Sequence, residues 1–407
     1  MDTITHGIAG ALIGKTLFRG DDLFSRRSMN RARIVTWAMT LGALFPDSDV
    51  FRDIFSHDHM LMITWHRSIT HSLLCLPIFA VVLAVISQQF VRWRKWDSPP
   101  VAQLTGIYAA GILSHILLDL ITTFGTMIWS PLAWSRPAWD LVFIVDFSLT
   151  GILLIPQLLE WVNRDSLHAK RRALLMWVIF VPSPFFIAAI ARIVGAPISD
   201  GAIISACLLF SLLFLLPAFR GWGARIPPVA WNRAGFAIAC AYIGLTIYGH
   251  HIALERVKNF VAFEHIQPES FGALPFPPSV LNWDGLVRTS RGVYEMRIDL
   301  TKKSAFNETS ASVGAPDPAA PPIEYKYFPD APQNLWIVRA KQLPEVQKVL
   351  WFDRFPVTQF HVENGAPVVE ISDLRFAKIR PDRPSSFTYQ VRFDTRGNVI
   401  SQGWLAR

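Results

Sequence analysis

Long apolar runs without charged residues constrain this chain more than any other feature. The run from Leu73 to Phe90 contains no charged residue. A helix needs about 20 apolar residues to cross a bilayer, and this run reaches nearly that length when the turn that precedes it is included. Similar runs recur through the first two thirds of the 407 residues, of which 51% are hydrophobic and only 17% are charged. This composition is too apolar for an ordinary soluble protein and predicts a mostly α-helical membrane protein.

The apolar runs predict a polytopic helical bundle of about seven to eight segments. The first run, from Ile4 to Phe18, is short for a full span, so we expect it to be tilted or partly re-entrant. The other segments are expected near 34–46, with a start near Arg31, and near 69–90, 101–124, 141–161, 173–194, 202–219 and 234–254.

Basic residues are concentrated in alternate connections between these segments. Fifteen Lys or Arg face four Asp in 19–33, 91–98, 162–172 and 220–233, whereas three Arg face six Asp in 47–67, 125–140 and 195–201. The positive-inside rule predicts that the first group is cytoplasmic and that both chain ends lie outside. The same rule accounts for the net charge of +8, so we expect the lipid bilayer as partner and no nucleic acid.

The composition changes after Leu254, where several prolines indicate a linker before a more polar region. Apolar residues then alternate with polar ones at 294–300 and 387–394, as half-buried strands require. A hairpin turn is expected at 395–398, a helix at 343–352 and a flexible loop at 304–322. We therefore predict a membrane domain at 1–260 and a smaller β-rich, extramembrane domain at 261–407, on the periplasmic or extracellular side.

Histidines and aspartates gather at the predicted outer ends of four segments. His115 and Asp119 are four residues apart, so they project from one helix face and can share an ion. His66 and His71 are five apart, about 140° around a helix, so His66 must precede the helix if both bind. The candidate metal ligands are His6, Asp47, Asp49, His66, His71, His115 and Asp119.

Each candidate also has a structural interpretation. A lone His or Asp near a span end is more often a satisfied interfacial residue, and we assign His57 and His59 to that class. Asp47-Ser48-Asp49 could equally form a turn or a helix cap. Asp119, in contrast, lies between apolar residues on both sides, so its carboxylate needs an internal partner. A ligand role is therefore favoured for the His115 and Asp119 pair.

Imidazole and carboxylate ligands without a thiolate favour a divalent transition metal, with Zn²⁺ preferred and Mn²⁺ or Fe²⁺ as alternatives. Seven candidate ligands exceed one tetrahedral site. The sequence therefore leaves open whether the site holds two or more ions or divides these residues between direct ligands and supporting groups.

The motifs, taken in order, resemble those of the YdjM-like (LexA-linked) inner-membrane metal-dependent hydrolase family of bacteria. Within residues 1–150 they are Asp2-x2-Thr5-His6, Pro46-Asp47-x-Asp49, His66-Arg67-x2-Thr70-His71-Ser72, His115-x3-Asp119 and Thr123-x-Gly125. The later Trp139-Asp140, Asp146, Pro275-x-Pro277 and Trp283 are similar to features of the longer members, although Phe147 stands where proline is expected.

The resemblance implies a multi-pass protein of the bacterial inner (plasma) membrane with a hydrolytic metal site. The motif order is also similar to that of zinc-dependent phospholipase C and P1-type nucleases, which cleave phosphodiesters. Around the ligands we expect supporting roles for Asp2, Thr5, Thr70, Ser72, Thr122, Asp140 and Asp146.

These features together predict a metal-dependent hydrolase that acts on a phosphoester or lipid-linked substrate at the outer face of the membrane. Asp47 or Asp49 would bridge ions or act as the base, and Arg67 would clamp a phosphate or anchor the span at the headgroups. The alternatives are a transporter-like protein and a metal-binding protein without turnover. The β-rich domain is expected to cover the mouth of the site and to select the substrate.

Overall fold

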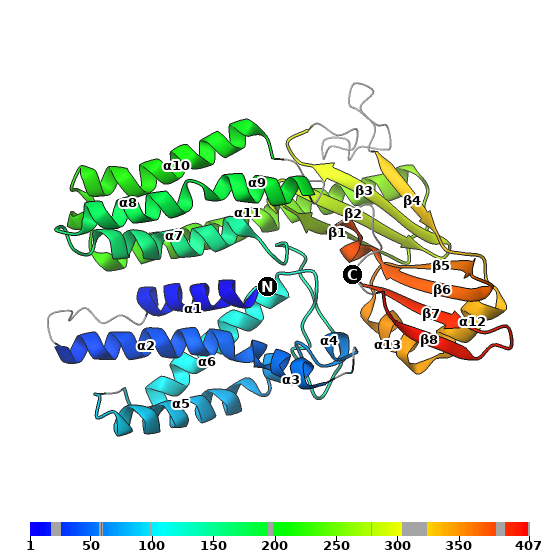
Figure 1. The fold of residues 1–407 in the computed structure, drawn as a ribbon, viewed down its shortest axis with the longest axis horizontal. Coiled ribbons are helices and arrows are strands. Elements are labelled where there is room, and N and C mark those ends of the chain that lie inside the picture. The colour runs from blue at the N-terminus through cyan, green and yellow to red at the C-terminus, as the bar shows by residue number, and fades with distance from the viewer. Residues whose placement is uncertain are drawn as a thin grey trace.

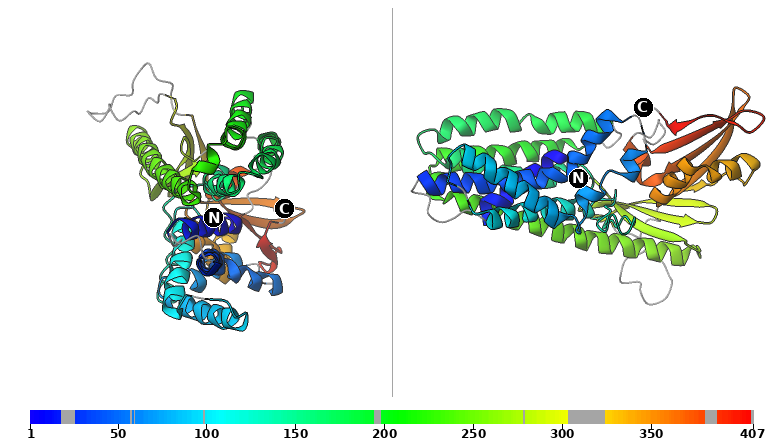
Figure 2. Two further views of the ribbon diagram at one scale, coloured as in Figure 1. Left: turned by 90° about the vertical axis from the view of Figure 1, so that its left-hand side faces the viewer. Right: turned by 90° about the horizontal axis from the view of Figure 1, so that it is seen from below.

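Two groups of helices run side by side along the long axis of the computed structural model, and two β-sheets extend beyond one end (Figures 1 and 2). The structure describes residues 1–17, 26–56, 58, 60–97, 99–193, 198–277, 279–302, 324–379 and 387–405. The first group comprises α1 (Thr3–Leu17), α2 (Arg26–Leu44), α5 (Leu76–Trp93) and α6 (Val101–Leu120). The second comprises α7 (Phe147–Asn163), α8 (Ala169–Phe180), α9 (Ser183–Ile193), α10 (Asp200–Phe219) and α11 (Pro228–Phe263).

Five helical stretches among the described residues are long and apolar enough to cross a membrane. They are Leu76–Trp93, Val101–Leu120, Ala169–Arg192, Asp200–Phe219 and Pro228–Phe263. The helices α1, α2 and α7 run alongside them (Figure 1). The predicted mostly helical membrane region is therefore confirmed, whereas the predicted count of seven to eight spans is not.

Several helices begin or end away from their predicted positions. The helix predicted from 69 begins at Leu76, because the hydroxyl of Ser72 accepts hydrogen bonds from the amides of Leu74 and Cys75 in a turn. The helix predicted from 141 begins at Phe147, where the Asp146 carboxylate caps it.

Two further helices also differ from prediction. The segment predicted at 173–194 consists of α8 and α9, separated at Pro182, which has no N–H to continue the first helix. The segment predicted at 234–254 is the 36-residue α11, which crosses the predicted domain boundary at 260.

The helices α1, α2 and α6 approach closely through glycines. A Cβ on Gly10 would lie 2.6 Å from the Cβ of Ala43, and one on Gly111 would lie 2.7 Å from the carbonyl oxygen of Met39. Small residues allow membrane helices to pack backbone against backbone. This packing brings the start of α1, the end of α2 and the last turns of α6 together.

Apolar side chains cover the outer faces of the helices. The exposed ones include Ile78, Val82 and Ile86 on α5, Phe185, Phe186 and Ile190 on α9, and Leu208, Leu209 and Leu212 on α10. Exposed apolar surface on this scale is expected of helices in contact with lipid.

The β-rich region consists of two four-stranded antiparallel sheets with strand orders β1-β2-β3-β4 and β5-β6-β7-β8. The first contains β1 (Ser270–Phe276), β2 (Asn282–Thr289), β3 (Gly292–Asp299) and β4 (Tyr325–Pro329), and the second β5 (Pro356–Glu363), β6 (Ala366–Asp373), β7 (Thr388–Phe393) and β8 (Val399–Trp404). The strands predicted at 294–300 and 387–394 correspond to β3 and β7, and the predicted turn at 395–398 joins β7 to β8.

Two helices accompany the second sheet, α12 (Leu335–Gln342) and α13 (Pro344–Phe352). The sequence predicted only the second. The flexible loop predicted at 304–322 lies outside the described residues.

Both sheets are attached to the helical region. The carboxyl end of α11 packs Ala253, Val257 and Phe260 against Trp283 and Met296 of the first sheet. The second sheet is held on the connection between α6 and α7, where Arg354 donates two hydrogen bonds to Asp140, at 2.9 and 2.8 Å.

Three short elements lie between α2 and α5 at the end of the bundle that faces the sheets (Figure 1). They are the 3₁₀ turn η1 (Phe45–Asp49), α3 (Val50–Phe55) and α4 (Leu61–Thr64), and they are followed by the 3₁₀ turn η2 (Ile69–His71). Four of the predicted metal ligands lie in this region: Asp47 and Asp49 in η1, His71 in η2, and His66 between α4 and η2.

The close contact at Gly111 can be tested with two matched glycine-to-alanine substitutions on α6. Gly111→Ala should destabilise the protein by about 1–3 kcal/mol, because the added methyl group overpacks the contact with α2. Gly106→Ala should be neutral or slightly stabilising, because a Cβ there has no neighbour within 4 Å. Thermal unfolding in one detergent measures both, and equal midpoints would contradict the packing described.

Candidate metal centre

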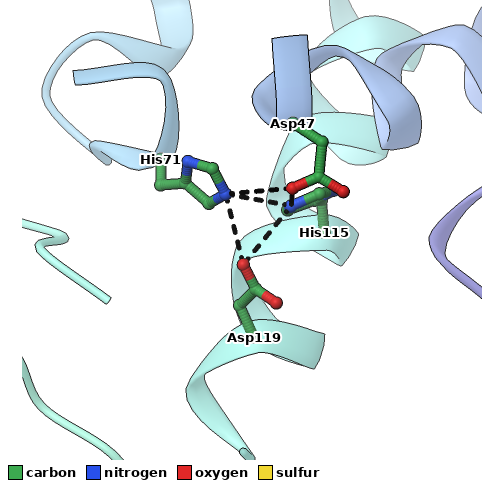
Figure 3. Close-up of side chains that lie close together, drawn as sticks. All are labelled: Asp47, His71, His115 and Asp119. Carbon is green, nitrogen blue, oxygen red and sulfur yellow. Dashed lines mark hydrogen bonds and ion pairs between the residues drawn. The ribbon is translucent and has the colours of Figure 1, made fainter. Parts of the chain in front are cut away.

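Four side chains from three elements converge at the end of the helical bundle (Figure 3). Asp47 comes from η1, His71 from η2, and His115 and Asp119 from α6. One potential ligand atom from each of the four lies within 4.8 Å of all the others. We call these four residues the metal-binding group.

The distances within the metal-binding group are short. The Nε2 atom of His115 lies 3.1 Å from Nε2 of His71 and 3.4 Å from Oδ1 of Asp47. The Oδ2 atom of Asp119 lies 3.2 Å from Nε2 of His71 and 3.4 Å from Nε2 of His115. Two imidazole nitrogens and two carboxylate oxygens therefore surround one small volume.

Local chain geometry brings these residues together. The four-residue spacing places His115 and Asp119 on one face of α6, as the sequence predicted. Pro46 in the first turn of η1 fits the end of α2, since its missing N–H needs no partner there. Arg67 has a φ of 63°, a left-handed conformation that redirects the chain between His66 and η2.

Both imidazoles of the metal-binding group are oriented through their other ring nitrogen. The Nδ1–H of His115 donates a hydrogen bond of 2.6 Å to the carbonyl oxygen of Ala43. The Nδ1 of His71 lies 3.0 Å from the hydroxyl of Thr70 and 3.5 Å from Oδ2 of Asp49. Such contacts fix the tautomer and leave Nε2 free to bind a metal.

Asp119 is fully buried, and its two carboxylate oxygens contact different groups. Its Oδ1 accepts a hydrogen bond from the amino group of Met1 and forms an ion pair with Nη2 of Arg67, 2.9 Å away. Its Oδ2 faces His71 and His115 and has no hydrogen-bond partner among the described residues. A buried acceptor oxygen without a partner, beside two oriented imidazoles, fits a divalent transition ion.

The carboxylates of η1 are held in their charged form. Burial alone would raise the pKa of Asp47, but hydrogen bonds from His115 and His71 outweigh it and hold this pKa well below its usual range. The hydroxyl of Thr3 donates a further hydrogen bond of 2.6 Å to Oδ2 of Asp47. A charged carboxylate is the form that binds a metal.

The other three predicted ligands surround the metal-binding group. His6 stacks on His115 with ring centroids 3.6 Å apart, and its Nε2 lies 3.2 Å from Oδ1 of Asp119. Asp49 and His66 contact each other, with Oδ1 of Asp49 3.0 Å from Nδ1 of His66. His57 and His59 lie outside the described residues.

Asp49 connects several groups beside the site. In addition to His66, it accepts hydrogen bonds from the amide of Arg67 and the hydroxyl of Thr70, at 3.0 and 3.2 Å. Burial raises its pKa, but the hydrogen bond with His66 leads the effects that lower it below the usual value.

Arg67 lies inside the site. Its side chain is only 3% exposed, and besides Asp119 it donates a hydrogen bond of 3.1 Å to the hydroxyl of Thr122. The guanidinium also lies over the ring of Phe124, 5.0 Å from its centroid. A side chain this buried serves to neutralise Asp119.

The predicted supporting residues divide into two sets. Thr70 and Thr122 contact the site as described, Ser72 donates to the carbonyl of Ser130 next to it, and Asp2 accepts from Thr5 at the start of α1. The remaining two, Asp140 and Asp146, serve other contacts.

Asp140 and Asp146 connect the helical region with the sheets. Asp140 binds Arg354, and Asp146 accepts hydrogen bonds from the hydroxyls of Tyr242 and Ser279, at 2.7 and 2.6 Å.

Sequence reasoning missed several groups of the site. Thr3 and the carbonyl of Ala43 gave no signal, because a hydroxyl at a helix start and a backbone oxygen are common features. Arg136 could have been found, since it is the only charged residue in 126–139. It donates hydrogen bonds to the carbonyls of Ile63, His66 and Gly125 and so holds the segment before η2.

We predict that each residue of the metal-binding group is needed to retain a bound metal ion. His71→Ala and Asp119→Asn should each lower the metal content of the detergent-purified protein at least about tenfold, since even supporting residues of metal sites contribute 10- to 100-fold to affinity. His168→Ala is the control, because His168 is exposed and pairs only with Asp165 among the described residues. Elemental analysis of monodisperse protein measures the content, and folded variants that retain full metal would contradict the assignment.

The amino-terminal part of the chain is similar to a known protein family. No curated protein and no solved structure matches the chain significantly. The five candidate spans, together with a family described as inner membrane protein, support a multi-pass protein of the inner membrane. Residues 1–194 match the model of the YdjM inner membrane protein family, which confirms the family resemblance drawn from the motifs.

Proposed function

We propose that this protein is a membrane-bound, metal-dependent hydrolase that acts on a phosphoester or lipid-linked substrate at the outer face of the inner membrane. The observation that carries this proposal is the metal-binding group, with its buried acceptor oxygen on Asp119. Two imidazoles and two carboxylates favour Zn²⁺ among the divalent transition metals. An ion there would act as a Lewis acid and would lower the pKa of water to about 7.

Asp49 and His66 form the second part of the proposed mechanism. The His66 side chain is 19% exposed, whereas those of His6, His71 and His115 are fully buried. Since Asp49 engages Nδ1 of His66, the Nε2 atom can face a substrate. We propose that His66 donates the proton to the leaving oxygen while Asp49 orients the ring, the division of roles common in acid-base pairs.

Positive charge beside the metal-binding group suits an anionic substrate. The guanidinium groups of Arg67 and Arg136 both lie over the ring of Phe124, at 5.0 and 4.9 Å from its centroid. We propose that they stabilise the negative charge of a phosphoryl group through the field they create, while their hydrogen bonds hold the walls of the site.

The β-rich region is proposed to restrict access to the site and to select the substrate. Among the described residues, the group of potential ligands that could hold an ion lies entirely in the helical region. The connection that follows β6 instead contacts the wall of the site, where the carbonyl of Thr123 accepts a hydrogen bond of 3.0 Å from Arg375.

A transporter-like function is the alternative. It is favoured by the buried carboxylate of Glu160 in α7, which pairs with Lys15 at 3.4 Å and with Arg164 at 2.6 Å. Charged groups buried among membrane helices often mark an ion or proton path. A metal-loaded protein that is inert on phosphoesters would favour this alternative or a metal-binding role without turnover.

Hydrolysis should follow the metal and should depend on His66. The wild-type protein should cleave bis(p-nitrophenyl) phosphate or phosphatidylglycerol in mixed micelles, and a chelator should abolish the activity. His66→Gln should retain the metal but lose about 10²- to 10⁴-fold in kcat, the usual contribution of a general acid. His168→Gln is the matched control. Loss of metal from the His66 variant would make His66 a ligand instead.

The orientation of the protein is open to a direct test. The connections α5–α6, α7–α8 and α10–α11 lie at the end away from the metal-binding group. Their basic residues include Arg94 and Lys95, Arg164, and Arg220 and Arg225. On the basis of the positive-inside rule, we propose that this end lies in the cytoplasm and that the sheets lie in the periplasm. A reporter that is active only in the cytoplasm should therefore be silent when it is fused after Arg407. An active fusion would reverse the side assigned to the site.

A further inference from the structure

The connection between α6 and α7 contains an aromatic segment whose tryptophans have no role in the proposed reaction. We propose that residues 128–139 lie in the headgroup region of the lipid bilayer and hold the metal-binding group at the level of the lipid phosphates. The partner is the phospholipid interface itself. This inference concerns membrane contact and does not require that the protein is a hydrolase.

The composition of this segment is that of a membrane interface. Its sequence, IWSPLAWSRPAW, contains three tryptophans and one charged residue in twelve. Tryptophan is enriched where membrane proteins meet the headgroups, because its ring is apolar and its N–H is polar. A loop of such composition would be unusual in contact with water alone.

The structure turns the apolar side chains outward and the charge inward. Trp129, Leu132, Trp134 and Trp139 are 47%, 82%, 54% and 49% exposed. The guanidinium of Arg136, in contrast, points inward to the carbonyls of Ile63, His66 and Gly125. The outer face of the segment therefore presents large apolar side chains without a charge.

This face continues the lipid-facing surface of the neighbouring helices. Exposed apolar side chains also lie on the adjoining ends of these helices: Leu74 just before α5, Ile78 in its first turn, Leu117 in the last turn of α6 and Phe147 at the start of α7. Because a bilayer covers these helices, the segment lies where the hydrocarbon region gives way to the headgroups.

Hydrogen bonds fix residues 128–139 to the part of the chain that contains His71. The carbonyl of Ile128 accepts from the amide of Leu73 at 3.0 Å, and the carbonyl of Ser130 accepts from the hydroxyl of Ser72 at 2.5 Å. The hydroxyls of Ser68 and Ser130 also lie 3.1 Å apart. The depth of the segment in the membrane therefore sets the depth of η2 and of the metal-binding group.

The placement has a consequence for the class of substrate. A centre held at headgroup level meets the phosphate of a lipid without extracting the lipid from the bilayer, whereas a soluble phosphoester must reach it from the aqueous side. A lipid phosphate is therefore the substrate class that the segment favours, and this last step alone rests on the proposed function.

Site-directed spin labelling of the full chain in phospholipid nanodiscs tests the depth. The three native cysteines, Cys75, Cys207 and Cys240, are first replaced by alanine, and a nitroxide is attached at Leu132→Cys or, in a second variant, at Trp134→Cys. Collision rates with oxygen, which concentrates in lipid, and with a water-soluble nickel chelate are then compared. Leu212→Cys on α10 serves as the lipid reference and Val362→Cys on β5 as the aqueous reference, since both side chains are exposed in the structure.

The proposal expects both labels in the segment to give an oxygen-to-nickel collision ratio between those of the two references and several-fold above that of Val362→Cys. A ratio equal to that of Val362→Cys would place the segment in water and overturn the proposal. Low collision rates with both reagents would mean that protein, such as a second copy of the chain, covers the segment, and would overturn it as well. Monodisperse gel filtration and retained metal content confirm that the labelled variants are folded.

Discussion

The buried carboxylate of Asp119 is the constraint on which the organisation of this protein depends. A charge in the interior of a helical bundle is costly unless partners surround it. Those partners come from separate parts of the chain: Arg67 from the turn before η2, the amino group of Met1 and His6 from the start of the chain. Compensation of one charge therefore draws three segments together, and the oxygen that none of them satisfies remains for an ion.

The packing of the helices therefore also determines the geometry of the site. The close approach of α1, α2 and α6 at Gly10 and Gly111 is what lets the carbonyl of Ala43 reach His115. The same approach lets Thr3 reach Asp47. Larger residues at the glycines would separate the backbones, and the ring and carboxylate orientations would be lost together with the packing.

Local patterns predicted much of this arrangement, and contacts between distant residues account for what they missed. The apolar runs indicated the helices, and the four-residue spacing indicated that His115 and Asp119 share a face. The late start of α5 could not be predicted, because it depends on contacts of Ser72 and Leu73 with residues 128–130. The same holds for Asp140, whose partner Arg354 is 214 residues away. Asp49 and His66 pair with each other for a reason that only the folded chain shows, the left-handed turn at Arg67.

The connection between α6 and α7 links the metal-binding group to the second sheet. Phe124 within it packs between Arg67 of the site and Phe352 of the β-rich region, 5.2 Å from the latter ring. Arg136 holds the segment that leads to His71, and Asp140 holds the second sheet. The β-rich region cannot move away without exposing Phe124 and leaving Asp140 unpaired. Because such exposure is costly, the second sheet and the metal-binding group behave as one structural unit.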